Sequence, residues 1–170
     1  MHLPEAQYDL RRMIAEVVEV EGPIEDELLL RRVREAWGEV GRAGSRIRDA
    51  FKNALESLGR RGLVSRIEVS YTYAGPSQLQ VVRVPGGNQM AGRSATQISR
   101  TEAKLAVQHI IADARRVSRD ELTLEVSRLF GWNRRGADIA AALNGAVDAL
   151  IGEGLIVEDE GFLTVTARAQ

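Results

Sequence analysis

The feature that most constrains the fold of this 170-residue chain is an internal repeat. Residues 44–64 align with residues 136–156 without a gap, and the matched positions are mostly apolar residues or glycine. A repeat that preserves apolar spacing predicts two segments with a common interior. The recurring residues are Gly44, Ile47, Ala50, Ala54, Leu58, Gly62 and Leu63, which return as Gly136, Ile139, Ala142, Ala146, Leu150, Gly154 and Leu155.

The repeat extends upstream after one extra residue in the first copy. There Val17-Val18, Ile24, Leu29, Val33, Trp37 and Gly38 face Ile110-Ile111, Val117, Leu122, Val126, Phe130 and Gly131. We therefore predict that the chain arose by duplication of one small unit.

Each copy is predicted to contain three helices. Apolar residues at i, i+3 and i+4 place these helices at about residues 8–20, 25–37 and 45–60, and again at about residues 100–114, 119–130 and 137–151. Ser99 with Glu102 and Ser118 with Glu121 have the spacing of capping boxes. Gly38 and Gly131 are expected to end the second helix of each copy.

A β-hairpin is predicted after the third helix of each copy. In the first copy it runs out over residues 63–73, turns at residues 74–77 and returns over residues 79–82; the second hairpin is shorter, over residues 155–165. Three helices followed by a hairpin is the winged-helix order. The predicted fold class is mainly α with small β-hairpins (α+β): two tandem winged-helix-like domains, residues 1–84 and 99–170, joined by a Gly- and Ser-containing linker, residues 85–98. The alternative is two helical lobes without wing geometry.

Composition excludes several classes of protein. The chain has 23 basic and 24 acidic side chains and no cysteine, which excludes a disulfide scaffold, a thiolate metal site and a protein that coats nucleic acid by bulk charge. The longest apolar runs are far shorter than the roughly 18–20 residues that span a bilayer, and the first residues lack a signal-peptide pattern. We expect a soluble, cytoplasmic protein that makes no contact with a membrane.

Three stretches of the first copy resemble a known family. Residues 21–24 (Glu-Gly-Pro-Ile), 28–33 (Leu-Leu-Leu-Arg-Arg-Val) and 42–47 (Arg-Ala-Gly-Ser-Arg-Ile) are similar to a bacterial domain of unknown function at the C-terminal end of large superfamily-1 helicase-like proteins. The second copy departs from this pattern, with Arg115-Arg116 in place of Gly-Pro and Asp138 in place of Arg46. The resemblance implies part of a DNA-processing enzyme whose helicase-like domains lie upstream. No Walker motif occurs in this chain, so the motor is expected elsewhere.

We predict no catalytic site, no metal site and no cofactor. The two histidines, His2 and His109, do not form a ligand pair at i, i+4. The acidic clusters at residues 25–27 and 120–121 fall in first helical turns, where they complement the helix dipole. The acidic run at residues 158–160 is expected to be a solvated turn.

The two copies differ in charge around the third helix. Residues 42–66 hold seven basic and two acidic side chains, a local charge of +5, whereas residues 132–157 have a local charge of −1. Phosphate contacts need cations at the helix start and the wing, so only the first copy is a candidate for binding duplex or junction DNA. The predicted DNA-binding residues are Arg42, Ser45, Arg46, Arg48, Lys52 and Arg60, with Ser45 as the helix cap.

A protein-interaction or dimerisation module without nucleic-acid contact is the alternative function. Small residues along the third helix of the second copy would allow close approach of the first copy, a second chain or the upstream domains. Tyr71 and Tyr73, on the long outgoing strand of the first hairpin, are predicted to form an interaction edge.

Overall fold

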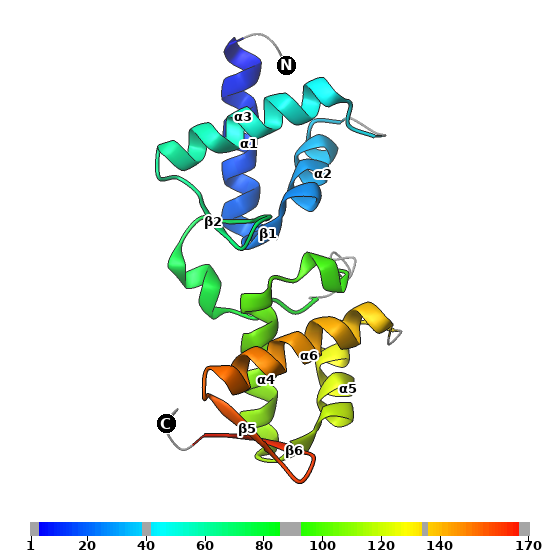
Figure 1. The fold of residues 1–170 in the computed structure, drawn as a ribbon. Helices are drawn as coiled ribbons and strands as arrows, with labels where there is room; N and C mark the ends of the chain where they lie inside the picture. Colours follow the sequence, from blue (N-terminus) through cyan, green and yellow to red (C-terminus); the bar gives the residue numbers. More distant parts are fainter. Residues whose placement is uncertain (1–3, 39–41, 86–92, 134–135, 167–170) are drawn as a thin grey trace. The chain divides into compact units, whose positions relative to one another are not determined.

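The computed structural model describes residues 4–38, 42–85, 93–133 and 136–166, and it divides into two units, residues 1–79 and 80–170 (Figure 1). Its described part is mostly helical, with two small antiparallel sheets of three strands each. The predicted α+β class is therefore confirmed.

The first unit contains three helices and three short strands around one apolar core. Side chains one helical turn apart on the first helix, Leu10, Ile14 and Val18, are at most 2% exposed, because i, i+4 spacing places them on one face. The elements are α1 (Pro4–Glu21), β1 (Ile24–Glu25), α2 (Asp26–Ala36), α3 (Ser45–Arg60), β2 (Ser65–Ile67), β3 (Tyr71–Tyr73) and the 3-10 helix η1 (Pro76–Gln80).

The hairpin of the first unit is much shorter than predicted. Its turn lies at residues 68–70, inside the predicted outgoing strand, and Glu68 has a φ of 54° there. The alternation of apolar and polar residues continues through this turn, so periodicity alone could not locate it. The predicted return strand, residues 79–82, is wrong, because residues 76–80 form η1.

Tyr71 and Tyr73 do not form the predicted interaction edge. Their strand, β3, lies in the centre of the sheet order β1-β3-β2, and Tyr71 is paired with both Glu25 and Ile67. Tyr71 is 7% exposed, so its ring belongs to the interior of the unit.

The Gln78 side chain of η1 forms hydrogen bonds with the backbone at the end of α1. Its amide nitrogen donates hydrogen bonds to the carbonyl oxygens of Val18 at 2.9 Å and Glu19 at 2.8 Å, and its amide oxygen accepts one from the backbone of Ala74 at 2.7 Å. The segment after the hairpin therefore pairs the Glu19 carbonyl, which would otherwise face the N–H-less Pro23, and gives the Val18 carbonyl a second hydrogen bond beside that from Gly22.

The second unit has the same order of elements as the first. Its strands are antiparallel in the order β4-β6-β5, which matches β1-β3-β2. The elements are the 3-10 helix η3 (Ala95–Gln97), α4 (Arg100–Ala114), β4 (Val117–Ser118), α5 (Arg119–Leu129), α6 (Ala137–Gly152), β5 (Ile156–Asp159) and β6 (Phe162–Val165).

Most helix boundaries lie within one or two residues of the predicted ones. Gly38 and Gly131 follow α2 and α5 with φ of 77° and 69°, as expected of glycines that end helices. Ser118 and Glu121 form the predicted capping box. Ser99 caps α4 by accepting a hydrogen bond from the backbone of Glu102, but the Glu102 carboxylate bonds to arginines instead of completing a box.

The two units divide between Leu79 and Gln80, upstream of the predicted linker. Residues 80–85 and 93–98 are grouped with the second unit, where Val82 packs against the core and Ile98 is buried. The remaining residues of the predicted linker, 86–92, lie outside the described part of the chain.

Candidate nucleic-acid interface and adjoining groove

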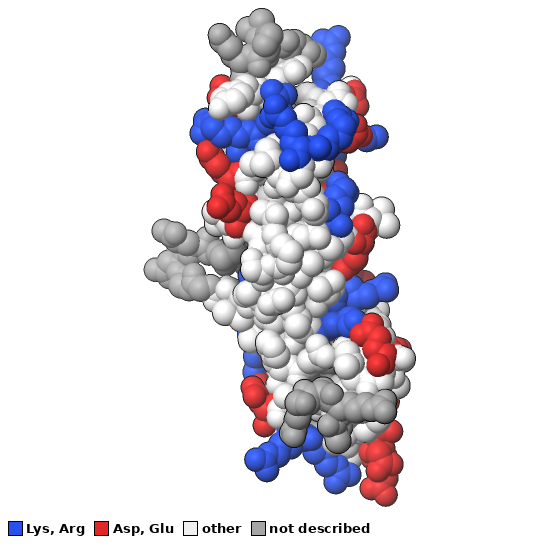
Figure 2. Space-filling model, turned by 90° about the vertical axis from the view of Figure 1, so that its left-hand side faces the viewer, with Lys and Arg blue, Asp and Glu red and all other residues white. Residues whose placement is uncertain are grey.

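The outer face of α3 carries the predicted DNA-binding residues of the first unit. Four side chains of this helix, Phe51, Ala54, Leu55 and Leu58, are buried in the core, so the remaining faces point outward. All six predicted DNA-binding residues lie on α3 or just before it, and all six are exposed: Arg42, Ser45, Arg46, Arg48, Lys52 and Arg60. On the surface drawn in Figure 2, basic side chains gather in the first unit, with acidic ones beside them.

The start of α3 has no side-chain cap. Gly44 is the N-cap residue, its backbone is extended (φ −71°, ψ 167°), and no side chain accepts a hydrogen bond from the first turn. The prediction that Ser45 caps the helix is therefore wrong, because Ser45 is already the first helical residue. Backbone N–H groups at an uncapped helix start can bind an anion.

Ion pairs divide the predicted cations into two groups. Arg48 donates to the carboxylate of Glu27 on α2, so it is not available for phosphate without breaking that pair. Arg60 lies 4.0 Å from Glu56 one turn earlier, and both side chains are more than half exposed, which makes a weak pair. Arg42, Arg46 and Lys52 form no ion pair with any carboxylate in the described ranges.

Asp26, the first residue of α2, ties the hairpin to the helices. Its carboxylate accepts a hydrogen bond from Arg66 of β2 at 2.6 Å and another from the Thr72 hydroxyl at 3.3 Å. The same Arg66 nitrogen donates to the carbonyl oxygen of Val69 at 2.6 Å, and the Val69 side chain is 91% exposed. The hairpin turn is thus held in place with an apolar side chain outside it.

A groove with a volume of about 790 Å³ runs between α3 and the hairpin, with the start of α2 at one end. Its floor is apolar and its rim carries three basic and three acidic side chains. The floor comprises Leu30, Phe51, Leu55 and Val64; the rim comprises Asp26, Glu27, Arg48, Lys52, Glu56 and Arg66, with Gly59, Ser65 and Val69 completing the walls. This groove was not predicted from sequence, because its lining comes from α2, α3 and the hairpin and depends on how they pack.

The corresponding region of the second unit is crossed by one arginine. Arg119, the first residue of α5, donates to Glu158 of β5 at 2.7 and 2.9 Å and to Asp148 and Asn144 of α6 at 3.1 and 3.2 Å. The hydrogen bond from Arg119 lowers the pKa of Glu158, and the same bond raises the pKa of Arg119.

The Asp26–Arg66 and Arg119–Glu158 pairs occupy equivalent places with opposite polarity. In each, one partner is the first residue of the second helix. The other partner lies on the outer strand of the hairpin. In the first unit it is Arg66, which is paired with Thr72 of the central strand, and Thr72 is also paired with the first strand. In the second unit Glu158 is paired with Leu163, which is also paired with the first strand. The aligned repeat contained this signal, since Asp26 faces Arg119 and Arg66 faces Glu158 in it.

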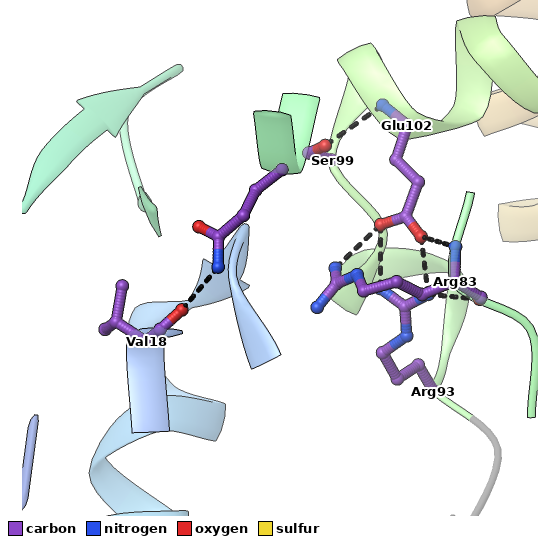
Figure 3. A network of polar contacts seen from close by, with 6 residues as sticks. Val18, Arg83, Arg93, Ser99 and Glu102 are labelled. Atoms are coloured by element: carbon purple, nitrogen blue, oxygen red, sulfur yellow. Dashed lines mark hydrogen bonds and ion pairs between the residues drawn. The ribbon is translucent and has the colours of Figure 1, made fainter. Parts of the chain in front are cut away.

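A buried ion cluster joins Arg83 and Arg93 to Glu102 of α4 in the second unit (Figure 3). The Glu102 side chain is 1% exposed; it accepts two hydrogen bonds from the Arg93 guanidinium, at 2.6 and 2.8 Å, and two from Arg83, one backbone and one side-chain, both at 2.8 Å. Burial by itself raises the pKa of Glu102, but the bonds from Arg93 and Arg83 and their positive charges together hold it below its ordinary value. Trp132 donates to the Arg93 carbonyl oxygen at 2.5 Å.

The described residues contain neither a candidate metal site nor a candidate membrane-spanning helix. No group of three or more His, Asp or Glu side chains in these ranges is placed to hold a metal ion, and His109 is an exposed residue of α4. Nor does any helix in them combine the length and apolar character needed to cross a bilayer.

Comparison with known proteins gives one match. Residues 1–49 match the model of a family described as a protein of unknown function (DUF3320), and this span covers α1, β1, α2 and the start of α3. It includes the three stretches on which the resemblance to a domain of unknown function was based. No curated protein and no solved structure matches the chain.

Proposed function

We propose that this chain is a non-catalytic accessory module of a bacterial, cytoplasmic helicase-like DNA-processing protein, built from two tandem winged-helix domains. Its first unit contacts duplex or junction DNA through α3. The observation that carries the proposal is the group of cations at the start and outer face of α3, Arg42, Arg46 and Lys52, that have no ion-pair partner among the described carboxylates.

The repeated element order supports the winged-helix assignment and the duplication. Both units have a first strand after the first helix, a third helix of 16 residues and a central last strand. Core positions that face each other in the repeat are buried in both: Phe51, Ala54, Leu55, Leu58 and Val64 correspond to Leu143, Ala146, Val147, Leu150 and Ile156. In winged-helix proteins the third helix lies in the major groove and the hairpin approaches the backbone.

The contrast between the units supports assigning DNA contact to the first one alone. Both third helices begin after a glycine without a side-chain cap, and the start of α3 lies beside two arginines, Arg42 and Arg46, which suit phosphate oxygens. In the second unit the first turn of α6 carries Asp138, and Arg119 is held by two carboxylates. The link to helicase-like proteins rests on the resemblance of residues 21–47, and the matched family has no assigned function.

Fluorescence anisotropy with a labelled duplex and a labelled junction, across a salt series, tests the proposal. We expect binding that weakens steeply with salt, because each neutralised phosphate contributes a slope of about −0.9 in log K against log salt. Arg42→Glu with Arg46→Glu should abolish binding, and Arg46→Ala alone should reduce the salt slope by about 1.

The matched control makes the same change in net charge away from α3. Arg100→Glu with Arg115→Glu alters two exposed arginines at the two ends of α4 and should leave the affinity nearly unchanged. Equal losses in the two double variants would indicate attraction by net charge and contradict a site on α3. No binding at low salt, together with a stable dimer in light scattering, would favour the protein-interaction alternative.

A further inference from the structure

The groove of the first unit is open at a position that the second unit fills. Gly59 is the fifteenth residue of α3, and Ile151 is the fifteenth residue of α6. Ile151 packs against the core of its unit, whereas a Cβ added at Gly59 would meet no atom within 4 Å. Gly59 is helical, so its backbone does not require glycine, and glycine inside a helix costs about 1 kcal/mol relative to alanine. No contact among the described residues of the first unit therefore requires glycine at position 59.

The bridging contacts differ at the same place. Asn144 and Asp148, the eighth and twelfth residues of α6, are joined to the hairpin by Arg119. The eighth and twelfth residues of α3 are Lys52 and Glu56, and among the described residues neither forms a hydrogen bond or ion pair with the hairpin. The first unit therefore has an apolar groove that no described side chain crosses, whereas in the second unit the Arg119 guanidinium and the Ile151 side chain lie at the equivalent positions.

The dimensions of the groove suit an α-helix. Its α3 wall runs from Arg48 to Gly59, a rise of about 16 Å at 1.5 Å per residue, which is the length of three helical turns. Aliphatic and aromatic side chains line the floor along this length, and the exposed Val69 side chain extends the apolar surface on the hairpin wall. Helices that bind in such grooves use apolar side chains at i, i+3, i+4 and i+7.

The charges of the rim identify the partner further. Arg48 is paired with Glu27 and Arg66 with Asp26, so these four side chains are neutralised within the unit. On the rim, Lys52 has no ion pair with a described carboxylate and Glu56 has only the weak pair with Arg60; the two lie one turn apart and are opposite in sign. A phosphate backbone would complement Lys52 and be repelled by Glu56, whereas a helix with an acidic and a basic residue one turn apart would complement both charges.

We infer that this groove binds an amphipathic helix of a partner protein, with aliphatic side chains on the floor and an acidic and a basic residue facing Lys52 and Glu56. This site shares Lys52 with the proposed DNA contact, but the DNA test changes Arg42 and Arg46 at the start of α3 and the groove test changes Gly59. Success or failure of the DNA measurements therefore leaves the test of the groove unaffected.

A displayed library of three-turn helical peptides with leucine fixed at i, i+3, i+4 and i+7, and all other positions varied, is the probe. Peptides selected on the full chain are measured by fluorescence anisotropy against the wild type and Gly59→Ile, which copies the residue of the second unit into the groove. We expect Gly59→Ile to weaken binding at least tenfold while its unfolding midpoint stays at or above that of the wild type. Lys52→Glu with Glu56→Lys should change which charges the library selects.

Gly145→Ile is the matched control, because Gly145 is an exposed residue inside α6 whose added Cβ also meets no atom within 4 Å. It should bind the peptides as the wild type does, and methyl shifts on binding should fall on Leu30, Leu55, Val64 and Val69. The proposal is overturned if no peptide is enriched, if Gly59→Ile binds as well as Gly145→Ile, if the shifts lie elsewhere, or if the groove proves to be occupied by a second copy that Gly59→Ile releases as monomer.

Discussion

Glu102 holds the most completely buried charge among the described residues that form ion pairs. Two arginines and five polar contacts surround one carboxylate and the serine that caps its helix (Figure 3). Removing one partner of a buried pair leaves uncompensated charge in a medium that solvates it poorly, and this costs more than the pair itself contributes. The stability of the second unit should therefore depend strongly on this one side chain.

We expect Glu102→Ala to lower the free energy of unfolding of the second unit by about 3–5 kcal/mol, because it strands the Arg83 and Arg93 guanidinium groups. Urea unfolding followed by the fluorescence of Trp132, which bonds to Arg93, measures the loss. Glu153→Ala breaks an exposed pair with Lys104 and is the control, with an expected loss of at most about 1 kcal/mol. A similar loss in both variants would contradict the role of the buried cluster.

The pH dependence follows from the sign of the pKa shift. The pKa of Glu102 is lower in the folded state than the ordinary value of 4.5, so its stabilising contribution is complete above that value and is lost as the pH falls below it. Wild-type stability should therefore drop more steeply than that of Glu102→Gln below about pH 4.5. Parallel pH profiles of unfolding free energy for the two proteins would contradict this expectation.

Gly22 is a second residue whose identity is fixed by its surroundings. A Cβ there would lie 2.5 Å from the carbonyl oxygen of Val18 and 2.4 Å from the Gln78 side chain. Gly22→Ala should therefore lower the free energy of unfolding by about 1–3 kcal/mol, the range for overpacking a buried site.

Gly59→Ala is the contrasting variant. Gly59 lies in open space on α3, so an added Cβ should raise the free energy of unfolding by about 0.5–1 kcal/mol. Thermal unfolding of the two variants decides, and a stable Gly22→Ala protein would show that the end of α1 can yield.

At the scale of the elements, helices were more predictable from sequence than the hairpin. Helix boundaries depend on local signals that can be read from the sequence. Examples are the serine at position 118, which caps α5, and the glycine at position 38, which can adopt the positive φ found there. The hairpin turn depends on which residues pair with β1, and the alternation around Val69 fits a strand equally well. The groove and the ion pair between Arg48 and Glu27 could not be predicted, since both depend on tertiary contacts with α2.

The reversed ion pairs can be tested by exchanging their polarity. Arg66→Glu alone places two carboxylates together, and Asp26→Arg alone places two guanidinium groups together, so each should destabilise the first unit. The double variant reproduces the polarity of Arg119 and Glu158 and should recover about 0.5–1 kcal/mol relative to the sum of the single effects. A double-mutant cycle in urea measures this coupling, and strictly additive effects would contradict an equivalent role for the two pairs.

At the scale of the whole chain, the sequence predicted the shared order of helices and strands in the two units, and it did not predict that residues 80–85 belong with the second unit. The repeat consists of matching apolar residues and glycines, and these can be read directly from the sequence. Residues 80–85 join the second unit through Val82 and Arg83, and the sequence of this short segment carries no signal of that attachment.

Fragments of the second unit test this attachment. A fragment of residues 80–170 should unfold cooperatively, whereas a fragment of residues 94–170 lacks both arginines and should be less stable by about 3–5 kcal/mol. Glu102→Gln should destabilise the longer fragment and stabilise the shorter one, because only the shorter one buries an unpaired carboxylate. Circular dichroism during urea unfolding measures all four, and the same sign of effect in both fragments would contradict the assignment.

The opposite polarity of the two anchoring pairs has a consequence for how the chain assembles. Two neighbouring segments with the same helices and the same strand order are at risk of exchanging parts while they fold. If the hairpin of one unit docked on the helices of the other, Arg66 would meet Arg119, or Glu158 would meet Asp26. Such a chimera would set like charges side by side, so the two ion pairs favour each β-hairpin on the helices of its own unit.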